Sequence, residues 1–177
     1  MADTLGVLTT SVPDRSRQAP EDDMLEHTET IDVDRPPREV YDFLANSENE
    51  VRWRKDVVSS ELVEGDGGQP GARYKQVMKP RRREVTGTHE IVAVEPGKRV
   101  DWRTPPGEGP IDFSGSYAVV PREGGSTVSL HTCVRARGLM RVGERFMKGY
   151  LRKLSRRYAE AIKDSLEGRT AQASPSN

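Results

Sequence analysis

The chain has 177 residues, no net formal charge and a single cysteine, Cys133. This length suits one domain, whose core needs neither a metal nor a disulfide for stability. One cysteine excludes an internal disulfide and favours a reducing compartment, so we expect a cytoplasmic protein. No run of 18 apolar residues occurs, which excludes a membrane-spanning helix, and the N-terminal residues do not resemble a secretory signal.

Both ends of the chain lack the periodic apolar positions that a packed element needs. Residues 1–24 are rich in Ser, Thr, Asp and Pro, so we expect a disordered acidic tail. We expect disorder also in residues 169–177. One folded domain, at residues 25–168, then remains.

The domain is expected to begin with a strand and two short helices. Residues 27–34 alternate between two faces, which predicts the strand. Asp34 is a candidate cap for the first helix, and Asn46 is its expected end. Ser47 and Glu50 match a capping box, which predicts the second helix.

The middle of the chain predicts six strands, because short alternating segments are separated by Gly- and Pro-rich turns. After Gly138, apolar residues recur at spacings of three and four as far as Leu166, which predicts a long helix that Gly168 ends. The predicted strands are residues 57–64, 72–79, 83–94, 99–103, 111–120 and 127–135.

Three stretches of the chain carry a resemblance to a known family. They are IDVDRPPREVYDFLANSENEVRWRKDV, AVEPGKRVDWR and SLHTCVRARGLMRVGERFMKGYLRKLSRRYAEAIKDSLE. They resemble the START-like (SRPBCC) superfamily, and most closely its polyketide cyclase/dehydratase-like branch. The resemblance implies an α+β helix-grip fold, in which a curled seven-stranded antiparallel sheet surrounds a long C-terminal helix and two short helices follow the first strand. It also implies a cavity between sheet and helix that takes lipids, polyketides, hormones or quinones. The superfamily has no universal catalytic motif.

The best functional signal is a set of large side chains on the faces that the pattern turns inward. Such stripes are more often solid core, but Gly115 lies between Phe113 and Tyr117, where a packed core would place a side chain. Gly143 and Gly149 also leave two positions of the predicted helix without a side chain. The predicted ligand-binding residues are Trp53, Tyr74, Gln76, Met78, Trp102, Phe113, Gly115, Tyr117, Phe146 and Tyr150.

Other residues that could carry chemistry give weaker signals. His89 and His131 have no neighbour at metal-ligand spacing, and His131 shares with Cys133 a strand face that points away from the predicted pocket. We therefore predict no metal and no cofactor, and identify no catalytic residue. Asp101 and Arg103 are also expected to face outward.

Charge is unevenly distributed along the chain. Residues 1–34 carry nine acidic and two basic side chains, whereas residues 135–157 carry nine basic side chains and one acidic. A second basic cluster spans residues 79–83. No nucleic-acid-binding motif accompanies these clusters, so a solvated face is the simpler interpretation and no specific nucleic-acid binding is expected.

The pattern favours a monomeric, non-catalytic binder of a small, largely apolar, polyketide-like, polycyclic or lipid-like molecule, acting as carrier, sensor or self-resistance protein. A cyclase or dehydratase acting in the same cavity is the alternative, because such chemistry needs little more than a shaped, dry site with a few polar groups. An interaction module that uses the basic helix is the third possibility.

Overall fold

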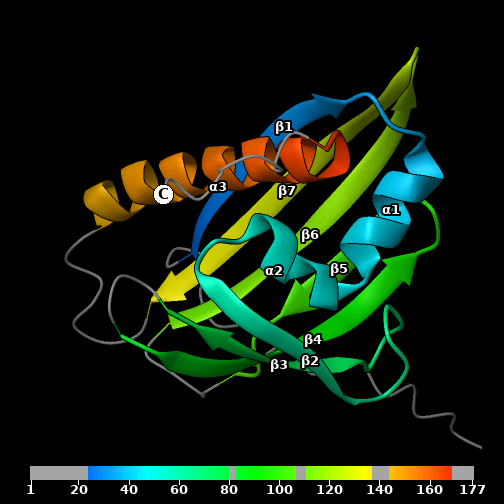
Figure 1. Cartoon of the computed structure of the whole chain (residues 1–177). Coiled ribbons are helices and arrows are strands. Elements are labelled where there is room, and N and C mark those ends of the chain that lie inside the picture. Colours follow the sequence, from blue (N-terminus) through cyan, green and yellow to red (C-terminus); the bar gives the residue numbers. More distant parts are fainter. Residues whose placement is uncertain (1–23, 80–82, 107–110, 137–143, 169–177) are drawn as a thin grey trace, which may run out of the picture.

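A computed structural model describes residues 24–79, 83–106, 111–136 and 144–168 (Figure 1). Seven antiparallel strands form one sheet in the order β1-β7-β6-β5-β4-β3-β2. The strands are β1 (Met24–Val33), β2 (Val57–Glu64), β3 (Arg73–Met78), β4 (Val85–Glu95), β5 (Arg99–Arg103), β6 (Ile111–Arg122) and β7 (Gly125–Ala136). The helices are α1 (Pro37–Ala45), the 3-10 helix η2 (Ser47–Asn49), α2 (Glu50–Trp53) and α3 (Glu144–Leu166).

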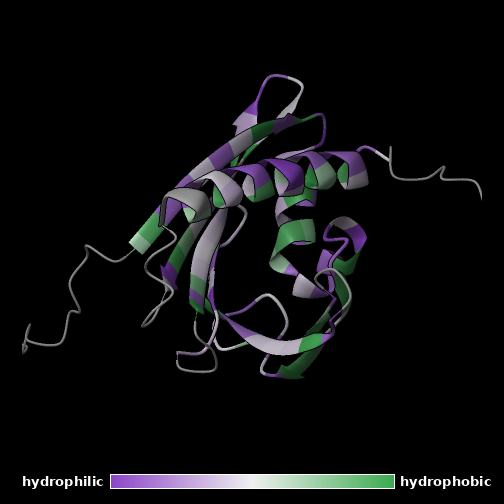
Figure 2. Ribbon diagram, turned by 90° about the vertical axis from the view of Figure 1, so that its left-hand side faces the viewer, coloured by the Kyte–Doolittle hydropathy of each residue, from purple (hydrophilic) through white to green (hydrophobic). Residues whose placement is uncertain are grey.

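The predicted helix-grip fold is confirmed. In the side view of Figure 2 the sheet curves beneath α3, and α1 and α2 lie across from the strands. The first strand pairs with the last along its whole length, from Met24 opposite Arg135 to Val33 opposite Ser126. The long helix then packs on this pair, so the two ends of the domain meet.

One hydrophobic core fills the space where α1 and the C-terminal half of α3 approach the sheet. Val33, Val40, Val100 and Ile162 are completely buried in it, and come from β1, α1, β5 and α3. A smaller cluster of Leu25, Val134 and Leu151 lies beneath the other half of α3. Apolar alternation in the strands and apolar periodicity in the helix thus meet on one side of the sheet.

Two local expectations at the start of the domain are wrong. Asp34 does not cap α1, because its carboxylate pairs with Arg122 and Pro36 occupies the cap position. Ser47 and Glu50 do not form a capping box: the Asn46 side chain accepts the Glu48 N–H at 3.0 Å. Glu50 is therefore free to turn inward. Asn46 does end α1, as predicted.

The turn glycine after α3 also agrees with its prediction, since Gly168 has a φ of 76°. Several expectations fall outside the described residues. These are the two tails, residues 80–82 of the basic cluster, Gly143, and the first turn of the predicted long helix before Glu144.

Candidate functional site

Four aromatic side chains meet between the sheet and α3. Trp53 of α2 lies edge-on to Tyr117 of β6, with ring centroids 6.1 Å apart, and edge-on to Tyr158 of α3, at 5.5 Å. Trp102 of β5 is tilted against Tyr117 at 6.1 Å. Edge-to-face contacts at these distances are favourable. The rings form a continuous chain from Tyr158 to Trp102, which we call the aromatic cluster.

The inner face of the sheet is not sealed at the Trp102 end of this cluster. Met78 is only partly buried, and Phe113, which shares the inner face of β6 with Tyr117, is 37 % exposed. Large apolar side chains on a core-facing surface are normally covered. This stretch of the inner face is therefore accessible.

The structure brings together most of the residues that the pattern placed inside. Trp53, Tyr74, Gln76 and Tyr117 are buried there. Tyr150 differs, because its ring is 62 % exposed, whereas the neighbouring Leu151 is buried. The expectation that Tyr150 faces inward is wrong. The side chain of Phe146 lies outside the described part of the structure.

Gly115 has a different role from the predicted one. A Cβ atom at this position would lie 2.2 Å from the His131 carbonyl oxygen and 2.9 Å from Cζ2 of Trp102. The space beside Gly115 is thus occupied by the indole ring and the backbone of β7. The glycine permits this close approach and does not itself leave a void.

A buried polar network adjoins the aromatic cluster at its Tyr158 end. Arg54 Nη1 donates to Glu50 Oε2 at 2.8 Å, and Arg54 Nη2 donates to Asp56 Oδ2 at 3.0 Å. Gln76 Nε2 donates to Glu50 Oε2 at 2.9 Å and to Ser60 Oγ at 3.2 Å. The network joins α2 to strands β2 and β3, and its charge-assisted bonds are the strong kind.

The same network reaches the long helix. The Tyr158 hydroxyl donates to Asp56 Oδ1 at 3.1 Å, and the Arg54 guanidinium lies 5.3 Å from the centre of the Tyr158 ring. These contacts fix α3 against the corner between α2 and β2. They also place charged groups directly beside the aromatic cluster.

The environment keeps the two tyrosine hydroxyls protonated. Burial, aided by the charge of Glu50 and opposed by that of Arg54, raises the pKa of Tyr117 well above its ordinary value. Burial raises the pKa of Tyr158 to about 12, with Arg54 opposing and Asp56 assisting. Both groups therefore act as hydrogen-bond donors at neutral pH. Burial acts to lower the pKa of Arg54, but Glu50, Tyr158 and Asp56 outweigh it, so Arg54 stays charged.

A second buried polar group lies further along β3 and β4. His89 Nε2 and Ser47 Oγ are 2.8 Å apart, and the imidazole stacks on Tyr74 with centroids 5.2 Å apart. The Tyr74 hydroxyl accepts the Gly68 N–H at 2.9 Å. Burial lowers the pKa of His89, which keeps the ring neutral. Both sides of the Ser47–His89 pair are buried, so it serves packing rather than nucleophilic chemistry.

The sequence interpretation missed most of these polar residues. His89 alternates in step with the buried Ile91, which was a usable signal for its inward direction. Glu50, Arg54 and Asp56 gave no such signal, because charged residues at this spacing are usually exposed.

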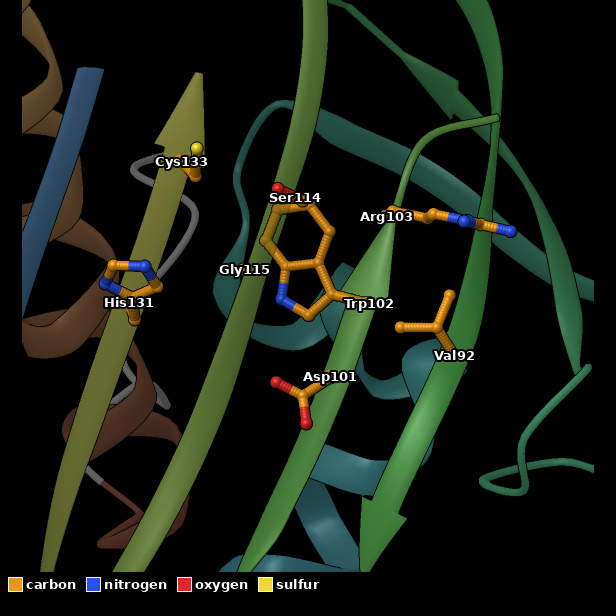
Figure 3. A pocket seen from close by; sticks show the side chains of 8 residues that line it. All are labelled: Val92, Asp101, Trp102, Arg103, Ser114, Gly115, His131 and Cys133. Carbon is orange, nitrogen blue, oxygen red and sulfur yellow. The ribbon is translucent and has the colours of Figure 1, made fainter. Parts of the chain in front are cut away.

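The outer face of β5, β6 and β7 carries a shallow hollow of about 230 Å³ (Figure 3). It is lined by Val92, Asp101, Trp102, Arg103, Ser114, Gly115, His131 and Cys133. Asp101, Arg103, His131 and Cys133 alternate with the core residues of their strands, so their outward direction is as predicted.

The ionised side chains of this hollow already have partners. The Asp101 carboxylate accepts hydrogen bonds from Nη2 and Nε of Arg99, at 2.7 Å and 3.0 Å. Arg103 pairs with Glu90 at 3.3 Å. His131 Nδ1 is 3.0 Å from Thr28 Oγ1. Burial raises the pKa of Cys133, which disfavours a reactive thiolate. The inner face, and not this hollow, is therefore the candidate functional site.

Two further kinds of site were sought among the residues that the structure describes. Their His, Cys, Asp and Glu side chains form no group of three or more that could hold a metal ion. Nor is any helix within them both long enough and apolar enough to cross a membrane.

Several solved structures share the fold of this chain. The Zhui aromatase/cyclase from Streptomyces sp. R1128 superimposes with a TM-score of 0.65 and 15% identity, covering 87% of this chain and 99% of its own. Ara h 8.0201 gives 0.64 and 17%, covering 82% and 99%. The di-domain aromatase/cyclase BexL of the BE-7585A biosynthetic pathway gives 0.66 and 21%; the match covers 84% of this chain but only 48% of BexL.

No curated protein matches the sequence. Residues 24–167 match a family model described as polyketide cyclase / dehydrase and lipid transport. The match includes every described helix and strand, and the structural neighbours agree with the START-like resemblance of the sequence. The chain belongs to this polyketide cyclase / dehydrase and lipid transport family.

Proposed function

We propose that the protein binds a small, largely apolar, ring-bearing molecule against the inner face of the sheet, beside the aromatic cluster. The observation that carries the proposal is the accessibility of this face at Met78 and Phe113, while the Trp53 and Tyr117 rings on the same side of the sheet are buried. Planar aromatic side chains suit a planar apolar ligand, because offset stacking adds to the gain from buried area. The family description is consistent with such a ligand.

Binding of the neutral dye Nile red tests the proposal. Wild-type protein is expected to raise the dye's fluorescence with saturation, and Tyr117→Ala to weaken binding at least tenfold. In a solid core, removing a large aromatic ring costs about 3–5 kcal/mol. If Tyr117 borders a ligand site, the loss of stability in urea falls clearly below that range.

Val120→Ala is the matched control, because Val120 lies on the same strand and is exposed. It should change neither dye binding nor stability. A wild type that takes up no dye, together with a Tyr117→Ala variant that unfolds, would show that the aromatic cluster is only a core.

A catalysed cyclisation is the second candidate function. It is favoured by the Tyr117 hydroxyl, a protonated donor beside charged groups in a buried setting. Incubation with a poly-β-ketone substrate separates the two functions. Ring closure faster than the uncatalysed rate, and lost in Tyr117→Phe, would replace the binding-only interpretation.

A further inference from the structure

The buried network beside the aromatic cluster has an unbalanced charge. One guanidinium, Arg54, is bonded to two carboxylates, Glu50 and Asp56. The side chain of Glu50 is 8 % exposed and that of Arg54 is 18 % exposed. The other members, Gln76, Ser60 and Tyr158, are uncharged, and His89 nearby is kept neutral. One positive and two negative charges leave a net charge of −1. Glu50 is the poorly solvated carboxylate of the two, since the side chain of Asp56 is 31 % exposed.

This network also contains hydrogen-bond donors without acceptors. Arg54 Nε is buried and has no hydrogen-bond partner. The indole Nε1 of Trp102 is buried as well and has no hydrogen-bond partner among the described residues. Tyr117 is 8 % exposed and lies beside this indole, with ring centroids 6.1 Å apart. If the ligand binds beside the aromatic cluster, the Tyr117 hydroxyl, which burial keeps protonated, is a further donor in its neighbourhood. Buried donors normally have acceptors, so these groups suit an oxygen supplied by a ligand.

We propose that the site selects neutral ligands that carry a carbonyl or ether oxygen, and that it rejects carboxylates of the same shape. In this inference, which rests on the proposed function, the Tyr117 hydroxyl donates a hydrogen bond to the ligand oxygen. Glu50 is the specificity-determining residue, because it is the more buried of the two carboxylates and is bonded to Arg54 on one side and Gln76 on the other.

A single guanidinium that is already bonded to two carboxylates has no net attraction left for a third anion, whereas a neutral acceptor is not repelled. The pKa of Tyr117 indicates the sign of the electrostatic potential at this position. Besides burial, the charge of Glu50 raises its pKa and outranks the opposing effect of Arg54, so a negative oxygen there is disfavoured.

A matched pair of probes tests the inference. 2-Acetylnaphthalene and 2-naphthoate have nearly the same shape, but the second carries a negative charge at neutral pH. Wild-type protein is expected to bind the ketone at least about tenfold more tightly than the carboxylate in a calorimetric titration at low salt. Tyr117→Phe should weaken binding of the ketone but not that of the hydrocarbon 2-ethylnaphthalene.

Replacing Glu50 tests the source of the selectivity. Glu50→Gln keeps the shape of the side chain, removes one negative charge and is expected to reduce the preference to about threefold or less. Glu61→Gln is the matched control, because Glu61 lies on β2 with an exposed side chain, and it should keep the wild-type ratio. If Glu50→Gln does not fold, the preference for the ketone is measured instead in Asp56→Asn, which removes the other carboxylate of the network.

The outcomes separate the inference from the proposed function. If the wild type binds neither the naphthalene probes nor Nile red, the proposed function fails. If it binds ketone and carboxylate equally, the function stands and the charge selection is wrong. If the preference exists but survives both Glu50→Gln and Asp56→Asn, the network is not its cause and the inference is overturned.

Discussion

The two faces of strands β5, β6 and β7 carry ionised groups on one side and aromatic rings on the other. On the outer face, Asp101 pairs with Arg99 along its own strand and Arg103 pairs with Glu90 on β4, and both arginines are about half exposed. On the inner face, Trp102 and Tyr117 belong to the aromatic cluster, which a buried network of charged groups adjoins. The same backbone thus supports two electrostatic environments a few ångströms apart.

Removing one partner of an ion pair therefore has different energetic consequences on the two faces. Arg99 and Asp101 are 49 % and 28 % exposed, so water screens their attraction and their removal leaves solvated groups. Arg54 and Glu50 are far more buried, so neither can lose its partner without leaving a charge in a poorly solvated place. Three predictions sharpen this difference.

The largest effect is expected from breaking the inner network. Arg54→Met should lower the free energy of unfolding by about 3–5 kcal/mol, because it leaves Glu50 and Asp56 without their counter-charge. Arg99→Met on the outer face should cost less than about 1 kcal/mol. Urea denaturation measures both, and equal costs for the two variants would contradict the contrast between the faces.

The second effect concerns two glycines in opposite surroundings. Gly115→Ala should destabilise by about 1–3 kcal/mol, because the new methyl group would meet the His131 carbonyl and the Trp102 ring. Gly149→Ala should instead stabilise by up to about 1 kcal/mol, since Gly149 lies in α3 with no atom within 4 Å of the added Cβ. A Gly115→Ala variant as stable as wild type would show that β6 and β7 adapt easily.

The fold was predictable from the sequence because its strands are short, alternating and separated by turn residues. Strands β2 and β5 begin and end at the predicted residues, where Gly65 and the Pro96-Gly97 turn interrupt the pattern. The candidate site was only partly predictable. Its aromatic residues follow from alternation, but Glu50 and Arg54, four positions apart, have the spacing of an ordinary surface pair. The pair is buried by residues far away in the chain, among them Gln76 of β3, which bonds to Glu50, and Tyr158 of α3, whose ring lies under Arg54.

The misplacement of Tyr150 has a geometric reason. The predicted stripe advances in steps of four residues, and each such step turns a helix about 40° beyond a full circle. Three steps back from Ile162 therefore place Tyr150 about 120° away from the buried face. Leu151 lies eleven positions from Ile162, just over three complete turns, and is buried in its place.

The smallest effect is a pH dependence that arises on the inner face. Burial lowers the pKa of His89 from the ordinary value of 6.5, so the unfolded chain takes up a proton before the folded one does. Stability should be full above pH 6.5 and fall as the pH drops toward the folded-state pKa, by at most about 1.4 kcal/mol per pH unit. His89→Gln should flatten this part of the profile.

Chemical denaturation at a series of pH values measures the effect. His131→Gln, a substitution of the same kind on the outer face, is the control. If both variants flatten the profile equally, His89 is not its source.

The pairing of the first strand with the last has a consequence for how the chain matures during synthesis. Thr28 and His131, joined by a hydrogen bond, are 103 positions apart, and Tyr158 must still arrive to complete the Asp56 contact. Contacts of this separation form slowly, because a long loop must close before any of them is made. The nascent domain therefore holds β1 without a pairing strand until β7 has left the ribosome, and its charged network stays incomplete until α3 has followed.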